Sequence, residues 1–143
     1  MELEQIAKRV AFIYPEATVL EAAERMKAEK IGAMVVLDDG RLVGIISERD
    51  IVSRVVAKRL APEHTRVSSI MTTHVITIHV GESKDEALER MHRAKCRHLP
   101  VVDRAERVVG MITILDLLDD RVEELSMKSS DLLAYIAADG PGG

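Results

Sequence analysis

Thr18-Val-Leu-Glu-Ala-Ala-Glu-Arg-Met26 is the stretch that decides the fold, because the chain repeats it as Ser83-Lys-Asp-Glu-Ala-Leu-Glu-Arg-Met91. Five positions are identical in the two copies: Glu21/Glu86, Ala22/Ala87, Glu24/Glu89, Arg25/Arg90 and Met26/Met91. Identity in register indicates a duplicated structural unit rather than two helices that merely share a periodicity. The chain is therefore expected to contain two copies of one motif.

The similarity continues beyond this stretch in both copies. Lys30/Lys95, Val36/Val101 and Asp38/Asp103 keep the same spacing, and after one inserted residue Arg41/Arg107, Val43/Val109, Gly44/Gly110, Ile46/Ile112 and Asp50/Asp116 match again. The insertion falls in a polar turn, where a connecting segment tolerates a change of length. The duplication therefore extends from the helix at least to the two aspartates.

Each copy predicts the element order β-α-β-β-α. Thr18 and Ser83 are each followed three residues later by glutamate, the capping-box pattern that begins a helix. The expected strands are 10–13, 33–37 and 41–46 in the first copy and 75–78, 99–102 and 107–112 in the second. Further helices are expected from Glu48, from Ile114, over 1–9 and around 132–136, and a disordered glycine-rich tail follows the last of them. Met26, Met34, Met91 and Met111 fall in apolar patterns and are expected in the core.

The composition narrows the range of functions. The chain has 143 residues, a net charge of −4 and only 2% aromatic residues. The net charge opposes non-specific binding to phosphate backbones, although it leaves room for a local basic patch, and aromatic side chains for stacking on bases are scarce. Cys96 is the only cysteine, the first residues are acidic, and no apolar run approaches a membrane span. A cytoplasmic protein without membrane or nucleic-acid partners is expected.

Three stretches resemble the CBS domain family, and together the two copies resemble a CBS pair, or Bateman module. These are Gly44-Ile-Ile-Ser-Glu-Arg-Asp-Ile51 with Gly110-Met-Ile-Thr-Ile-Leu-Asp-Leu117, Arg97-His-Leu-Pro-Val-Val-Asp103 with Gly32-Ala-Met-Val-Val-Leu-Asp38, and Ser69-Ile-Met-Thr-Thr-His-Val-Ile-Thr77. The Ser-Glu-Arg-Asp stretch further resembles the small stand-alone members of the family. The resemblance covers about residues 8–120.

The resemblance implies an α/β (α+β) fold in which two tandem CBS motifs pack as a pseudo-two-fold disc. The expected division is 1–66 for an N-terminal extension and the first motif, 67–122 for the second motif, and 123–143 for a C-terminal helix and tail. It also implies a homodimer, and two clefts that take AMP, ADP, ATP, NAD or S-adenosylmethionine. AMP is the first choice of ligand, with NAD next.

A hydroxyl and a carboxylate three residues apart form the centre of each proposed cleft, Ser47 with Asp50 and Thr113 with Asp116. An ionised aspartate can accept hydrogen bonds from the two hydroxyls of a ribose. The same spacing also fits plain N-terminal capping of a helix, and the two roles can coexist. In the family, the aspartate binds ribose and the hydroxyl helps to hold ribose or phosphate.

Six further residues are candidates for the ligand contact: Arg49, Arg97, His98, Gly32, Ala11 and Ile76. Arg49 and Arg97 could bind phosphate with a planar donor fork, although Arg49 could equally be a solvated charge. Leu115 occupies the position of Arg49 in the second copy, so the two clefts cannot be chemically equivalent. His98 could instead be a packed histidine, and Ala11 and Ile76 could serve strand packing alone.

Several classes of function remain open. No P-loop, nucleophile elbow or HExxH pattern occurs, so a non-catalytic protein is expected. Cys96 and His98, with His92 nearby, lack the tight spacing of a zinc site, and no metal is expected. The leading hypothesis is a nucleotide-responsive regulator of an unknown partner protein. The alternative is a ligand-free structural adaptor that acts through protein contacts.

Overall fold

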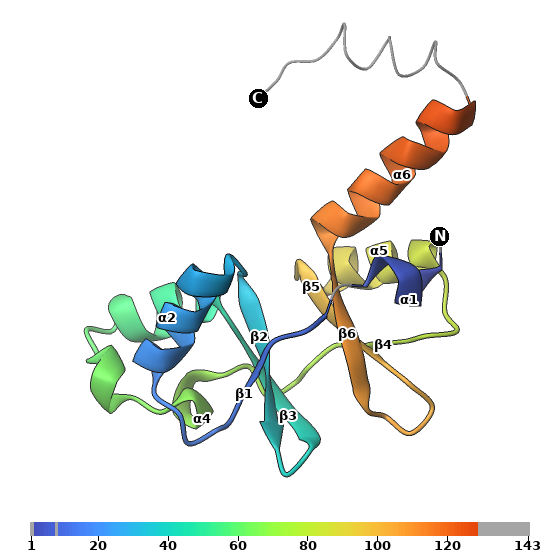
Figure 1. Cartoon of the computed structure of the whole chain (residues 1–143). Helices are drawn as coiled ribbons and strands as arrows, with labels where there is room; N and C mark the ends of the chain where they lie inside the picture. The colour runs from blue at the N-terminus through green and yellow to red at the C-terminus, as the bar shows by residue number, and fades with distance from the viewer. Residues whose placement is uncertain (1, 8, 129–143) are drawn as a thin grey trace, which may run out of the picture.

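The computed structural model describes residues 2–7 and 9–128, in which both copies of the motif are complete (Figure 1). The first comprises β1 (Phe12–Ile13), α2 (Val19–Glu29), β2 (Ala33–Asp38), β3 (Arg41–Ser47) and α3 (Glu48–Ile51), which continues as a π-helical turn, η1 (Val52–Val56). The second comprises β4 (Ile78–His79), α5 (Lys84–Ala94), β5 (His98–Val102), β6 (Val108–Thr113) and α6 (Ile114–Lys128). The predicted β-α-β-β-α order is confirmed, whereas the helix expected around 132–136 lies outside the described residues.

The described residues also form three short elements: α1 (Leu3–Ile6), the 3-10 turn η2 (Pro62–His64) and α4 (Val67–Ile70). None of the helices in the described part of the chain combines the length and the apolar character needed to cross a bilayer.

The two sheets have the same topology. In the first, β1 runs parallel to β2 and β3 pairs antiparallel with β2, and β4, β5 and β6 repeat this order in the second. The register also agrees, because Val36 pairs with Gly44 and Val101 with Gly110, and both pairs are followed by an irregularity. The repeated residues therefore specify the same strand pairing twice.

The long helix of each copy begins and ends in the same way. The Thr18 and Ser83 hydroxyls accept hydrogen bonds from the backbone N–H of the residue three positions on, each at 3.1 Å. This is one half of the predicted capping box, since the Glu86 carboxylate instead accepts from Arg90 Nε at 3.1 Å. Both helices end at a lysine in the left-handed region, Lys30 with φ 56° and Lys95 with φ 55°.

The repeated arginine of these helices holds the leading strand. Arg25 Nη1 donates to the carbonyl of Phe12, and Arg90 Nη1 donates to the carbonyl of Thr77 at 2.8 Å. Phe12 and Thr77 occupy the same position of the repeat. Each leading strand has only two residues, so the contact with the helix adds a second attachment to the strand pairing.

The core has three parts. One lies between the helices and sheet of the first motif, one lies in the second motif, and a third joins the two sheets through Ala33, Val35 and Met111. The prediction that four methionines lie in the core is confirmed, since Met26, Met34, Met91 and Met111 are all at most 7% exposed. The apolar contact between the sheets brings the two copies together.

The short helices α1 and α4 cross between the copies. Leu3 and Ile6 of α1, which precede the first motif, are buried in the core of the second. Val67 and Ile70 of α4, which precede the second motif, are buried in the core of the first. Figure 1 shows α1 beside α5, with α4 at the other end of the molecule near β1. Each core is therefore completed by the short helix that precedes the other copy in the sequence.

Candidate functional site

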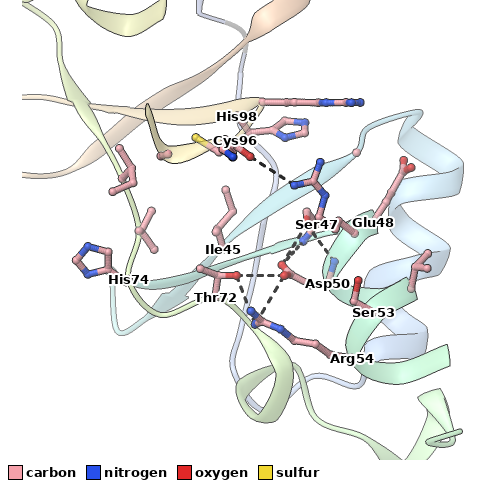
Figure 2. A pocket seen from close by; sticks show the side chains of 18 residues that line it. Ile45, Ser47, Glu48, Asp50, Ser53, Arg54, Thr72, His74, Cys96 and His98 are labelled. Carbon is pink, nitrogen blue, oxygen red and sulfur yellow. Dashed lines mark hydrogen bonds and ion pairs between the residues drawn. The ribbon is translucent and has the colours of Figure 1, made fainter. Parts of the chain in front are cut away.

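Two clefts lie where the motifs meet. Cleft 1, of about 630 Å³, is lined by Ser47, Arg49, Asp50, Arg54, Thr72, His74, Ile76, Lys95, Cys96 and others (Figure 2). Cleft 2, of about 870 Å³, is lined by Arg9, Ala11, Lys30, Met111, Thr113, Ile114, Leu115, Asp116 and Asp119, among others. All ten candidate residues of the sequence line one or both of these clefts.

Ser47 and Asp50 form a reciprocal cap at the start of α3. The Ser47 backbone N–H donates to Asp50 Oδ2 at 2.9 Å, and the Asp50 backbone N–H donates to Ser47 Oγ at 3.3 Å. The Ser47 hydroxyl also donates to Asp50 Oδ2 at 3.1 Å. The capping geometry is therefore present, while both residues also face cleft 1. Asp50 is only 7% exposed, so its carboxylate is held in one place.

The second carboxylate oxygen of Asp50 has partners that the motif pattern did not predict. The Thr72 hydroxyl donates to Asp50 Oδ1 at 3.1 Å, and Arg54 Nη1 lies 3.7 Å from the same oxygen (Figure 2). Arg54 Nη1 also donates to the Ile70 carbonyl at 2.9 Å. Arg54 lies one helical turn after Asp50, and this spacing could have predicted the contact. Thr72 has no such local signal, because it arrives from the segment after α4.

Thr113 and Asp116 repeat the cap at the start of α6. The Thr113 backbone N–H donates to Asp116 Oδ2 at 3.0 Å, and the Asp116 backbone N–H donates to Thr113 Oγ1 at 3.1 Å. Asp116 is 7% exposed, like its counterpart, and faces cleft 2. The two hydroxyl–carboxylate pairs thus have the same geometry in different clefts.

The wall between the clefts is formed by residues that precede the two middle strands, together with the start of α3. Gly32, Arg97, His98 and Glu48 line both clefts. Backbone hydrogen bonds of 3.0 Å fix this wall, from Glu48 N–H to the Gly32 carbonyl and from Ile114 N–H to the Arg97 carbonyl. Burial lowers the pKa of His98, which favours the neutral imidazole in the wall.

The matching residues of the leading segments divide between the clefts. Ile76 lines cleft 1 and Ala11 lines cleft 2. The Ala11 carbonyl accepts a hydrogen bond from Val35 N–H at 3.1 Å, so this carbonyl also takes part in strand pairing. Ala11 and Ile76 therefore each lie in a leading segment at the border between a cleft and a sheet.

The residue between hydroxyl and carboxylate differs between the clefts. Arg49 Nη1 donates to the Lys95 carbonyl at 3.4 Å, a contact that joins the first motif to the end of α5. Leu115, at the same position of the repeat, is 66% exposed. Among the described residues, cleft 2 also contains four charged residues that were not candidates: Arg9, Lys30, Glu48 and Asp119. Their charges are visible in the sequence, but their convergence on one cleft is not.

The surroundings of Cys96 bear on whether it could belong to a metal or a redox site. No group of three or more histidine, cysteine, aspartate or glutamate side chains within 2–7 and 9–128 could hold a metal ion. Cys96 lines cleft 1 and is half-buried. Its pKa is raised by burial, which favours the protonated thiol over the reactive thiolate.

The comparisons with known sequences agree on one family. The CBS domain family matches residues 3–57 and 67–123. The chain is 32% identical over 122 residues to the CBS domain-containing protein YhcV of Bacillus subtilis, covering 85% of this chain and 86% of YhcV. It is 38% identical over 109 residues to CBSCBSPB2 of Arabidopsis thaliana, covering 76% of this chain and 20% of that protein. The chain spans about a fifth to a quarter of the length of the first curated relatives it matches.

Solved structures share the fold. A CBS domain protein of Pyrobaculum aerophilum complexed with AMP is 29% identical, with a TM-score of 0.75, covering 81% of this chain and 89% of that one. The CBS domain pair of protein MJ0100, in complex with 5′-methylthioadenosine and S-adenosylmethionine, is 28% identical, with a TM-score of 0.78, covering 87% and 98%. With the duplicated β-α-β-β-α unit and the paired sheets, these matches establish that the chain belongs to the CBS domain family as a tandem pair of CBS motifs.

Proposed function

We propose that this CBS pair is a non-catalytic regulatory module that binds an adenine nucleotide in the clefts between its motifs. The observation that carries the proposal is the hydroxyl–carboxylate pair in each cleft, Ser47 with Asp50 and Thr113 with Asp116. Each aspartate has one oxygen, Oδ2, in the helix cap. An ionised carboxylate has four acceptor positions. Asp50 uses two of them for Ser47 and one for Thr72, so a ribose would take the remaining position at Oδ1 and replace the Thr72 hydroxyl there.

The surroundings of the aspartates suit the other parts of a nucleotide. Arg49 in cleft 1 and Arg97 in the wall bring guanidinium groups that pair well with phosphate oxygens. Apolar side chains such as Ile76 and Met111 line the same clefts and offer surface to a base. The related structures with AMP, 5′-methylthioadenosine and S-adenosylmethionine support an adenosine ligand. AMP is our first choice, with NAD and ATP next.

We assign binding rather than catalysis because the two carboxylates face separate clefts. Asp50 lines cleft 1 and Asp116 lines cleft 2, so they do not face one another across a single substrate. A mechanism that used this pair as acid and base would require both aspartates to reach the same reacting centre. The protein is expected to act in the cytoplasm, where a half-buried single thiol such as Cys96 remains reduced.

Ligand binding can be transmitted because each cleft is built from both motifs. A ligand that touches Asp50 on α3 and Ile76 of the second motif favours one relative position of the motifs over others. A partner protein that prefers that position would then respond to the ligand concentration.

We further propose that two copies associate through the helices that follow the aspartates. Val52 and Val56 in the first motif and Leu118 and Val122 in the second occupy equivalent repeat positions, and all are at least 44% exposed. Two equivalent apolar stripes form a surface suited to pairing with a second copy about a two-fold axis. Light scattering should give a dimer mass for the wild type and a monomer mass for Leu118→Glu. A monomeric wild type at micromolar concentration would contradict dimerisation.

Calorimetry with AMP, ATP, NAD and S-adenosylmethionine tests the ligand proposal directly. We expect at least one to bind, and the double variant Asp50→Asn/Asp116→Asn to lose that binding while keeping the helical circular dichroism. Asp38→Asn is the matched control, because Asp38 is exposed at the end of β2 and outside both clefts. If the wild type binds none of the four, the regulator is refuted in favour of the ligand-free adaptor. Deletion of residues 128–143 should then abolish partner capture.

A further inference from the structure

The helices that follow the two aspartates carry different charges at equivalent positions. Arg49, Ser53 and Arg54 of the first copy correspond to Leu115, Asp119 and Asp120 of the second. Arg49, Ser53 and Arg54 all line cleft 1, whereas Leu115 and Asp119 line cleft 2. The first two exchanges make the lining of cleft 2 less positive than that of cleft 1, and the third leaves cleft 2 without a counterpart of Arg54 in its lining. The duplication has therefore kept the hydroxyl–carboxylate geometry and changed the charge beside it.

Cleft 1 has an excess of positive charge among the described residues. Its cationic side chains are Arg49, Arg54, Lys95 and Arg97, and its carboxylates are Glu48 and Asp50. The contacts of Arg54 in the described part of the chain all use Nη1, so Nη2 and Nε keep their donors for another acceptor. Arg49 makes a long contact, of 3.4 Å, with the Lys95 carbonyl. A phosphate could replace that carbonyl as a stronger, charged acceptor.

Cleft 2 has balanced charge among its lining side chains. Among the described residues, its cationic side chains are Arg9, Lys30 and Arg97, and its carboxylates are Glu48, Asp116 and Asp119. Asp120, the counterpart of Arg54, binds Lys84 Nζ at 2.9 Å. Ile114 and the exposed Leu115 present aliphatic surface beside Asp116. A phosphate in this cleft would lie near Asp119 and would lack the guanidinium that Arg49 supplies in cleft 1, and both differences disfavour an anion.

We infer that the two clefts select different classes of adenosine ligand: cleft 1 takes adenosine phosphates, and cleft 2 takes adenosine derivatives whose 5′ substituent carries no negative charge, such as a thioether or a sulfonium. This inference rests on the proposed function, because both ligand classes share the ribose contact with Asp50 or Asp116. It implies that the protein senses the two classes independently. One chain could then respond to both the occupancy of cleft 1 by a phosphate ligand and the occupancy of cleft 2 by a thioether ligand.

The repeat itself supplies the test variants. Arg49→Leu gives cleft 1 the residue of cleft 2, and Leu115→Arg with Asp119→Ser gives cleft 2 the residues of cleft 1. AMP and 5′-methylthioadenosine serve as probes in calorimetry, because they share adenosine and differ in charge. Arg104→Leu is the control, since Arg104 is exposed in the β5–β6 turn and lines neither cleft. Circular dichroism verifies the fold of every variant.

For the wild type we expect AMP at one site per chain and 5′-methylthioadenosine at a second site, without competition between the two. Arg49→Leu should weaken the binding of AMP by about tenfold or more, the effect of a lost charge-assisted hydrogen bond. It should change the affinity for 5′-methylthioadenosine by less than about twofold. Leu115→Arg/Asp119→Ser should add a second AMP site. Added KCl should weaken the binding of AMP but not that of 5′-methylthioadenosine, because salt screens the interactions of the charged ligand only.

The possible failures are distinguishable. If the ligands bind but compete for one site, or if Arg49→Leu affects both equally, the charge-based division is wrong while the proposed function stands. If neither ligand binds the wild type, and ATP, NAD and S-adenosylmethionine also fail, the proposed function and the division fall together.

Discussion

The close passage of residues 71–72 over β3 requires a glycine at position 44. A Cβ added there would lie 2.5 Å from Met71 Sδ and 3.0 Å from the Thr72 carbonyl. The same segment pairs with β3, since Ile45 N–H donates to the Thr72 carbonyl at 2.9 Å. The glycine therefore lets residues 71–72 pass close to the strand and bring the Thr72 hydroxyl to Asp50.

We expect Gly44→Ala to destabilise the protein by about 1–3 kcal/mol, because the added methyl must displace Met71 and strain the adjacent backbone. Urea denaturation, with the free energy of unfolding compared at equal slope, measures the loss. Gly81→Ala is the matched control, since a Cβ there meets nothing within 4 Å. Equal stability of the two alanine variants would show that the segment has room to move.

His98 links the wall between the clefts to pH. Its pKa is lowered chiefly by burial and further by Arg97, against opposing effects of Glu48 and Asp116. The unfolded chain thus takes up a proton near the ordinary pKa of 6.5, while the folded chain resists it to lower pH. Proton uptake by the unfolded state costs stability, so the contribution of His98 falls as the pH decreases below that value.

We therefore expect the wild type to lose more stability between pH 7.5 and pH 5.5 than His98→Gln does. The measurement is the urea midpoint of each protein at the two pH values. The comparison isolates His98, because His79, whose pKa is raised by its hydrogen bond with Glu106, is present in both proteins. Parallel pH profiles would mean that His98 titrates alike in the folded and unfolded states.

At the level of elements, Arg90 joins α5 to the leading strand and its turn. Its guanidinium donates to the Thr77 carbonyl at 2.8 Å and makes a two-pronged contact with the Glu82 carboxylate. Arg90 and Glu82 are 27% and 30% exposed, so the pair is partly shielded from water. A lysine cannot reproduce three contacts in a planar fork.

Arg90→Lys should consequently lower the free energy of unfolding by about 1–2 kcal/mol, the value of lost charge-assisted hydrogen bonds in a partly buried setting. Equilibrium denaturation measures the change. Arg93→Lys, one turn away and 61% exposed, should cost less than about 0.5 kcal/mol. If the two substitutions cost the same, Arg90 contributes only as a surface charge.

The elements were largely predictable because they follow from local patterns. The hydroxyl caps at Thr18 and Ser83 and the short apolar runs of the strands are local features, so the sequence pattern indicates them. The contact of Thr72 with Asp50 depends on a segment that arrives from 22 positions away, which no local pattern encodes. The sequence shows that Asp120 in the second copy takes the position of Arg54 in the first. The location of Arg54 in cleft 1, however, is seen only in the structure.

At the level of the whole molecule, the crossed helices make the two motifs interdependent. Leu3 of α1 is fully buried in the core of the second motif, and Val67 of α4 is fully buried in the core of the first. Neither motif, cut from the chain at its repeat boundary, would retain its complete core. The repeat in the sequence and the packing units in the structure are thus offset from one another, which the duplication alone does not reveal.

This offset predicts a crossed response to cavity-forming substitutions. Leu3→Ala should cost about 2–5 kcal/mol and Val67→Ala somewhat less, because each leaves a void in a closed core. Hydrogen exchange locates the effect: Leu3→Ala should accelerate exchange in β5 and β6, and Val67→Ala in β2 and β3, each in the motif that its sequence position does not suggest. Ala22→Gly provides a control within the first core, since Ala22 is buried on α2. It should accelerate exchange in β2 and β3, as Val67→Ala does. Loss of protection confined to the repeat that carries the substitution would contradict the crossed packing, whereas equal loss in both sheets would mean that the pair opens only as one unit.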